Sequence, residues 1–321
     1  MLRAMNFQNW NQIEPGFFVI GETKPINDTQ ALTNDAFTEK WTTYADEEIA
    51  EQEKLFEFQR KWFLELYGFA DEMQLAEHLQ KFEYILDAGC GLGYKAAWFA
   101  KLAPSSTVIG IDFSSASYTA YQRYKDKFSN LVFAKGDIAN TLLDAGSIGF
   151  TVCDQVIMHT DDPRKTLSEL SRITNNDGQI CCYWYRKKAL PRELLDDYFR
   201  ENTSKLSSEE LWALSKEVLE LGRMLNDLKI EANFPDLPSL GIVGGKMDLQ
   251  RFIYWNFIKC FWNEELGYST SLATNFDWYS PVNAKRFSEL EVESDLKNAG
   301  LKRLCWHEEE ACFSGRFTKI V

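Results

Sequence analysis

The sequence has few of the side chains that hold metal ions or bind nucleic acids. It contains only three histidines, His78, His159 and His307, and its seven cysteines form no Cys-x-x-Cys pair. Acidic residues outnumber basic ones, 48 against 35, which gives a formal net charge of -13. An acidic surface repels a nucleic-acid backbone, and zinc sites need closely spaced cysteines and histidines. We therefore expect no metal site and no nucleic-acid partner.

Long apolar runs are also missing. No stretch approaches the ~20 apolar residues that cross a membrane, and residues 1–11 contain no apolar signal core. We expect a cytoplasmic protein with a substantial core, because 45% of its 321 residues are hydrophobic. The cysteines lie mostly in apolar segments, which is typical of reduced, buried thiols: Cys90, Cys153, Cys181, Cys182, Cys260, Cys305 and Cys312.

The most informative stretch is ILDAGCGLGY at residues 85–94. An apolar run ends at Asp87, glycines follow at Gly89, Gly91 and Gly93, and a helical pattern begins. Glycine permits backbone angles and close approaches that a side chain would block, and a helix start attracts anionic groups. Dinucleotide sites usually show G-x-G-x-x-G instead. Three interpretations stay open: a site for S-adenosylmethionine (SAM), a dinucleotide site, or a turn without a ligand.

Strands and helices alternate after this turn, which predicts a parallel sheet with helices on both faces. Ligands of such sheets bind beyond the carboxyl ends of the strands, so the residues there are the candidates for a site. We expect strands at residues 84–87, 107–112, 131–134, 149–158 and 178–185, and helices at 93–102, 115–128 and 163–174.

Polar residues stand at several of these strand ends. Asp112 ends the second strand 112 − 93 = 19 residues after Gly93, where a carboxylate accepts ribose hydroxyls; a helix-capping role for this region is the alternative. Asp137 follows the third strand in a Gly-Asp pair that is also an ordinary turn. The fourth strand leads to His159 and to an Asp162-Pro163 helix start.

Taken together, these motifs resemble the class I SAM-dependent methyltransferases. The glycine turn resembles motif I of that superfamily, the strand leading to His159 resembles motif IV, and Asp177-Gly178 resembles the turn into the fifth strand. From residue 37 onward the chain also resembles a little-characterised bacterial branch. The resemblance implies an α/β, Rossmann-like, seven-stranded sheet with an antiparallel last strand, and SAM as cofactor with S-adenosylhomocysteine (SAH) as product. It implies cofactor contacts from Asp87, Gly89, Gly91, Gly93, Tyr94, Asp112, Phe113, Asp137, Ile138, Asp154 and Gln155.

His159 and Asp154 are the candidate catalytic residues. Imidazole titrates near neutral pH and His159 follows a strand on the cofactor side, which suits a general base; a packing role beneath the cofactor is the alternative. Asp154 lies in an apolar run, where an unpaired carboxylate is costly, so we expect a polar partner for it.

The alternation stops after the fifth strand, which predicts four units. Residues 1–82 form an irregular segment and a helical cover or lid, with helices at 46–67 and 71–80. Residues 83–186 form the SAM-binding core. Residues 187–286 form an aromatic-rich helical insertion with helices at 192–201, 211–225 and 248–262. Residues 287–321 add a helix at 287–299 and strands at 301–306 and 311–320.

The insertion supplies the candidate substrate contacts Arg251, Tyr254, Trp278 and Tyr279, although an aromatic stripe is also typical of a core. We expect transfer of a methyl group to O or N of a small molecule. The alternatives are a catalytically silent SAM-binding or scaffold protein, a protein or RNA methyltransferase, and a SAM-fold enzyme with other chemistry. A homodimer stays open.

Overall fold

The computed structural model describes residues 7, 9–21, 27–45, 49–203 and 205–320. Its centre is a nine-stranded sheet in the order β1-β2-β5-β4-β3-β6-β7-β11-β10. Five parallel strands form the middle of this sheet, and two antiparallel strands follow β7 at one edge. The five parallel strands are β3 (Tyr84–Ala88), β4 (Thr107–Asp112), β5 (Leu131–Lys135), β6 (Ile148–Cys153) and β7 (Thr174–Tyr185). The two strands beyond β7 are β11 (Cys312–Lys319) and β10 (Leu301–Glu308).

Seven strands, β5-β4-β3-β6-β7-β11-β10, confirm the predicted fold class, with the last strand β11 antiparallel to β7. The central strands are buried on both faces, as their continuous apolar sequences require. β3 lies between β4 and β6, pairing Leu86 with Ile109 on one side and Thr151 on the other. The chain adds β4 and β5 on one side of β3 and then crosses to add β6 and β7 on the other side, and this reversal of strand order places a ligand site at the carboxyl end of β3.

The N-terminal segment corrects the sequence prediction, because residues 10–20 form a hairpin rather than an irregular coil. β1 (Trp10–Glu14) and β2 (Phe17–Ile20) extend the sheet beyond β5. Phe17 pairs with Phe133 in parallel register, and the Trp10 indole donates a hydrogen bond to the Thr141 carbonyl at 2.8 Å. Burial of Trp10, Phe17 and Ile20 holds this edge in place.

Helices cover both faces of the sheet, and their ends follow local sequence signals. Asp71 and Asp162 accept backbone N–H bonds at the starts of α3 and α6, and Pro163 occupies the first turn of α6. Ser288 and Glu291 form a capping box at the start of α11. The helices on the sheet are α3 (Glu72–Leu79), α4 (Tyr94–Leu102), α5 (Ala116–Tyr124), α6 (Pro163–Ile173) and α11 (Glu289–Asn298).

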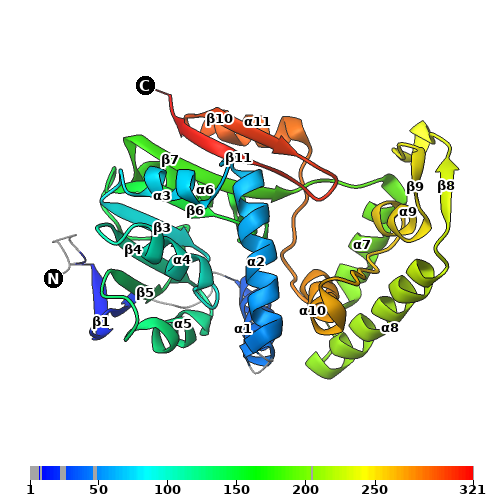
Figure 1. The fold of residues 1–321 in the computed structure, drawn as a ribbon, viewed down its shortest axis with the longest axis horizontal. Helices are drawn as coiled ribbons and strands as arrows, with labels where there is room; N and C mark the ends of the chain where they lie inside the picture. The colour runs from blue at the N-terminus through cyan, green and yellow to red at the C-terminus, as the bar shows by residue number, and fades with distance from the viewer. Residues whose placement is uncertain (1–6, 8, 22–26, 46–48, 204, 321) are drawn as a thin grey trace.

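A second helical unit lies beside the sheet, and α2 (Ile49–Leu66) runs between the two in the view of Figure 1. This unit contains one helix and one hairpin that the sequence did not predict, α10 and β8–β9, and the predicted helix at 248–262 ends at Asn256. Its elements are α7 (Leu190–Thr203), α8 (Ser208–Asp227), β8 (Glu231–Phe234), β9 (Gly245–Asp248), α9 (Leu249–Asn256) and α10 (Gly267–Tyr279). Helix α1 (Asp28–Ala45) packs against α10.

The chain enters the helical unit and returns from it at neighbouring residues of the core. The Phe287 N–H donates to the Tyr185 carbonyl at 2.8 Å, and the Lys187 N–H donates to the Phe287 carbonyl at 2.9 Å. The chain therefore departs from the end of β7 and returns beside the same residues. The exact division of the chain into four units stays a prediction.

Candidate active site

A cavity of about 730 Å³ lies at the carboxyl ends of the parallel strands. The glycine turn and the ends of β4 and β6 form one wall, α1 and α2 form a second, and the helical unit forms a third. Thirteen of the predicted site residues line it: Gly89, Gly91, Tyr94, Asp112, Phe113, Asp137, Ile138, Asp154, Gln155, His159, Arg251, Tyr254 and Trp278. Asp87, Gly93 and Tyr279 are not among the described residues that line it. The individual roles of these residues stay predictions.

The glycine turn is tight because neighbouring side chains occupy the space around it. Gly89 has a φ of +85°, and a Cβ on it would lie 2.4 Å from Val156. Gly93 has a φ of +74°, and a Cβ there would lie 2.7 Å from Phe133. Gly91, with a φ of 50°, lines the cavity. The turn thus needs glycine for packing and for backbone angle, and it presents main chain to the cavity.

Asp112 ties the glycine turn to the end of β4. Its Oδ2 accepts the Gly91 N–H at 2.9 Å, and its Oδ1 accepts the N–H and hydroxyl of Ser114 at 2.8 and 2.6 Å. Burial raises the pKa of this carboxyl, and the Ser114 and Gly91 hydrogen bonds oppose that effect. Each carboxylate oxygen has two lone-pair sites, so Oδ2 retains capacity for one further donor such as a ribose hydroxyl.

Asp154 has the polar partner that its apolar surroundings require, and the partner is Lys95. The Lys95 Nζ lies 2.5 Å from Asp154 Oδ2, and the Tyr67 hydroxyl donates to Oδ1 at 2.8 Å. Burial alone would lower the pKa of Lys95, but the Asp154 carboxylate raises it above its ordinary value. Sequence reasoning missed Lys95, whose signal is a charged residue in the first turn of a mostly apolar helix. These contacts argue for a positioning role for Asp154.

Asp87 is a buried carboxylate at the base of the glycine turn. Within the part of the chain that the structure describes, neither of its oxygens accepts a hydrogen bond of normal geometry. Burial raises its pKa to about 6, although Lys95 acts in the opposite direction. A cationic group near this carboxylate would favour its ionised form.

His159 ends the short 3₁₀ helix η1 (Ile157–His159) beside the cavity. Its Nδ1 lies 2.7 Å from the Asn283 carbonyl, and an N–H at Nδ1 is required to donate to that oxygen. Nε2 is then the basic nitrogen of the neutral ring. The rings of Phe37 and Tyr185 meet the imidazole edge-on at 4.9 and 5.5 Å between centroids. This geometry suits a base and also a packing role, so both alternatives remain.

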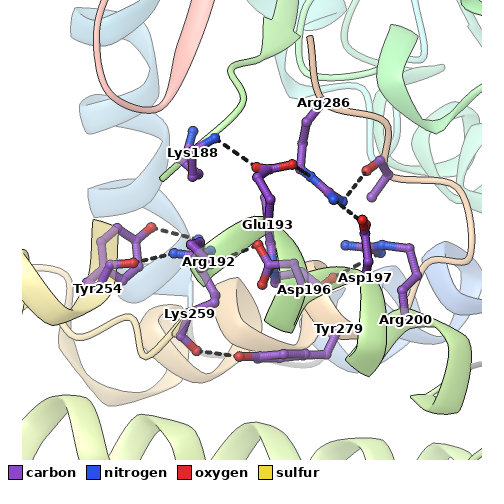
Figure 2. Close-up of polar contacts among 12 residues, drawn as sticks. Lys188, Arg192, Glu193, Asp196, Asp197, Arg200, Tyr254, Lys259, Tyr279 and Arg286 are labelled. Carbon is purple, nitrogen blue, oxygen red and sulfur yellow. Dashed lines mark hydrogen bonds and ion pairs between the residues drawn. The ribbon is translucent and has the colours of Figure 1, made fainter. Parts of the chain in front are cut away.

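The helical unit brings cations and aromatic rings to the far wall of the cavity. Arg192 is fully buried, pairs with Asp196 at 2.8 Å and donates to the Tyr254 carbonyl (Figure 2). The Lys259 Nζ donates to the Tyr254 hydroxyl at 2.7 Å. The Tyr279 hydroxyl donates to the Lys259 carbonyl at 2.8 Å and thereby supports this wall from behind. Sequence reasoning missed Lys188, Arg192 and Lys259 as cavity residues.

Three other findings bear on the sequence expectations. Among the described residues, no group of three or more His, Cys, Asp and Glu side chains gathers as a metal ligand set would. None of the described helices combines the length and apolar character needed to span a bilayer. Six of the seven cysteines are buried, as predicted, and Cys305 is half-buried.

The strand order and the glycine turn define a nucleotide-binding, Rossmann-like domain. Residues 79–228 match the model of a family described as a methyltransferase domain. The chain is 29% identical over 116 residues to an uncharacterised methyltransferase of Schizosaccharomyces pombe, covering 34% of this chain and 42% of that protein. It is 34% identical over 99 residues to an uncharacterised 37.1 kDa protein in transposon Tn4556 of Streptomyces fradiae, covering 30% and 29%. The chain thus spans less than half the length of these relatives.

Two solved structures are similar to the chain at lower sequence identity. Magnesium protoporphyrin IX methyltransferase of Synechocystis PCC 6803, with bound SAH, is 13% identical with a TM-score of 0.47, over 91% of this chain and 100% of that one. PKMT2 of Rickettsia typhi is 20% identical with a TM-score of 0.48, over 74% and 43%. The family match and the strand topology place residues 79–228 in the class I SAM-dependent methyltransferases, whose cofactor is SAM.

Proposed function

We propose that the protein is an enzyme that transfers a methyl group from SAM to an oxygen or nitrogen atom of a small molecule. The observation that carries the proposal is a continuous cavity, which joins the glycine turn to the aromatic wall of the helical unit. A cofactor at one end and an acceptor at the other would share one enclosed space. Enclosure and alignment of the reacting atoms are what a displacement at a methyl group requires.

The residues around the glycine turn fit SAM. Gly91 and Asp112 present main chain and a carboxylate edge to the cavity, and Asp137 and Ile138 line it near the end of β5. We assign Asp112 to the ribose hydroxyls and Asp137 with Ile138 to the adenine. When bound, SAM supplies an electrophilic methyl group on a sulfonium. The chain itself supplies orientation, exclusion of water, and His159 as an acceptor for a departing proton.

The stacked pair of Phe56 and Tyr94 helps to keep water out of the cofactor end. Their ring centroids lie 4.5 Å apart and their planes differ by 9°, which joins α2 to the first turn of α4. Both residues line the cavity. Because low polarity strengthens the electrostatic interactions inside a site, this closure favours transfer of a methyl group from a cationic donor.

Calorimetric titration with SAM and with SAH tests the cofactor part of the proposal. The wild-type protein should bind both, and Gly91→Val should lose binding, because a β-branched residue is strained at a positive φ and fills the cavity side of the turn. Gly245→Ala is the control, because Gly245 also has a positive φ and a Cβ added to it would meet no atom within 4 Å. Near-native affinity of Gly91→Val would overturn the assignment of the turn.

Radiolabelled SAM tests the transfer itself. The label should pass to the small-molecule fraction of a cell extract and leave the protein and nucleic-acid fractions unlabelled. Label in protein or RNA would replace the small-molecule acceptor with a macromolecule. Binding of SAM without transfer to any fraction would favour a catalytically silent SAM-binding protein.

A further inference from the structure

Positive charge is concentrated at the acceptor end of the cavity, in a protein whose formal net charge is -13. Lys188, Arg192, Arg251 and Lys259 all line this end, together with Tyr254, Trp255 and Trp278. They come from three separate parts of the helical unit, namely the segment before α7, α7 itself, and α9 with the residues that follow it. Their convergence is therefore a product of the fold rather than of a basic run in the sequence.

Three of these cations form no side-chain ion pair within the described part of the chain, although the Glu193 carboxylate accepts the Lys188 main-chain N–H at 2.7 Å. Arg192 is neutralised by Asp196, but no ion pair to Lys188, Arg251 or Lys259 occurs among the residues that the structure describes. The Lys188 Nζ donates to the carbonyls of Arg186 and Ala311 at 2.7 and 3.1 Å, and Lys259 donates to the Tyr254 hydroxyl. The same cavity is also lined by three acidic residues, namely Asp277 on α10 of the helical unit, and Glu309 and Glu310, which precede Ala311.

Charges of one sign in an enclosed space are costly unless a counter-charge enters. Burial lowers the pKa of Lys188 to about 7, and the nearby charges of Arg192 and Lys259 act in the same direction, while the Glu193 carboxylate opposes them. Lys259 is itself only 8% exposed. An oxyanion bound between these ammonium groups would relieve the repulsion and accept charge-assisted hydrogen bonds.

Flat rings stand beside the same cations. The Lys188 Nζ lies 5.3 Å from the centre of the Trp255 ring, and the Lys259 Nζ lies 5.1 Å from that of Trp278. The exposed Arg251 guanidinium lies 5.1 Å from the rings of both Tyr254 and Trp255. Aromatic walls bind flat apolar bodies, whereas ammonium groups bind anions.

We propose that the methyl acceptor is a flat, apolar molecule bearing an oxyanion, held by Lys188 and Lys259 with Arg251 at the entrance. The oxyanion is a carboxylate or a phosphate ester. This inference rests on the proposed function, because it names the acceptor class of the same cavity. It adds Lys188 and Lys259 to the substrate contacts Arg251, Tyr254 and Trp278 that the sequence predicts.

Titration of the wild-type protein with small probes tests the inference, with SAH present and in its absence. Benzoate and phenyl phosphate should bind at least about tenfold more tightly than the neutral analogues benzamide and benzyl alcohol. The tighter of the two anions identifies the oxyanion. Equal affinity for charged and neutral probes would overturn the inference even when SAH binds normally. Absence of SAH binding would overturn the proposed function instead, and the anion preference would still be read from the titrations without SAH.

Variants then locate the site. Lys259→Met and Lys188→Met should each weaken the anionic probe about tenfold and leave the neutral analogue unchanged. Lys246→Met is the matched control, because Lys246 is on the exposed hairpin and its side chain is 74% exposed. Thermal unfolding of each variant checks the fold. Undiminished anion affinity in both folded variants would contradict the assignment, and a variant that fails to fold leaves the wild-type comparison as the decisive measurement.

Discussion

The Lys95 ammonium and the Asp154 carboxylate lie 2.5 Å apart, and their side chains are only 8% and 3% exposed. The pair joins the first turn of α4 to the end of β6, directly beside the glycine turn. A buried ion pair gives little net stability over an apolar pair, but the loss of one partner leaves the other charge buried alone.

Lys95→Met should therefore lower the free energy of unfolding by about 3–5 kcal/mol, as measured by urea denaturation. Lys61→Met, which breaks the exposed Lys61–Glu57 pair at 2.8 Å, should cost less than about 1 kcal/mol. A second change, Asp154→Leu, should restore part of the loss in the Lys95→Met protein, because it removes the unpaired carboxylate. A loss below about 1 kcal/mol for Lys95→Met alone would contradict this account of the pair.

The buried Asp87 carboxyl predicts a pH dependence of stability. Its pKa is raised from the ordinary 3.8 to about 6, so the folded state holds a proton that the unfolded state releases. The free energy of unfolding should then fall as pH rises from about 4 through 6, by about 3 kcal/mol in total, and stay level above that range.

Comparison of wild type with Asp87→Asn isolates this contribution. The difference in free energy of unfolding between the two proteins should shift by about 3 kcal/mol between pH 4 and pH 7, in the direction of lower wild-type stability at pH 7. Asp126→Asn, at an exposed position, shows the effect of removing one acidic surface group. A pH-independent difference between wild type and Asp87→Asn would exclude the raised pKa.

Asp112 should contribute to cofactor affinity through both the ribose and the glycine turn. Asp112→Ala should weaken SAH binding by about 1–3 kcal/mol in calorimetry, the cost of unmade hydrogen bonds to a charged group. Asp112→Asn keeps one oxygen acceptor and should lose less. If Asp112→Ala binds SAH as tightly as wild type, Asp112 has no ribose role.

His159→Ala separates the two roles that the geometry allows. A general base should contribute roughly 10²-fold or more to kcat, with little change in the KM for SAM. The acid limb of the pH–rate profile should also disappear, because the group whose protonation stops the reaction is gone. Unchanged kcat with a lowered Tm would instead return His159 to packing between Phe37 and Tyr185.

Sequence patterns predicted the parts of the fold in which local signals and tertiary packing agree. The strand at residues 107–112 appears with the predicted bounds, since its apolar run suits a strand buried on both faces. The hairpin at residues 10–20 escaped prediction, because β1 is short, exposed along its middle and rich in polar side chains. The pairing of β2 with β5 depends on partners more than a hundred residues away.

Helix α10 escaped prediction for a different reason. Its sequence, GYSTSLATNFDWY, is rich in serine, threonine and aromatic residues, which are weaker helix formers than alanine or leucine. Packing overrides that preference: Trp212 of α8 stacks on Phe276 at 4.0 Å, and the Asn275 side chain both accepts from and donates to the Phe261 main chain. Local sequence also fails to reveal Lys95, Lys188 and Lys259 as cavity residues, because tertiary packing brings these distant positions to one cavity.

The helical unit is tied to the core at the hydrogen-bonded residues Tyr185, Lys187 and Phe287. The two ends of the helical unit lie side by side, so a segment inserted there can change in length or content at small entropic cost. The reason is that the entropy of closing a loop grows only slowly with its length. Strand β7, which precedes this junction, takes its register from its pairing with β6 and β11, and neither pairing involves the helical unit. Under the proposed function, the helical unit selects the methyl acceptor and the core binds the donor, so grafting a foreign segment between these anchors should alter the first property and preserve the second.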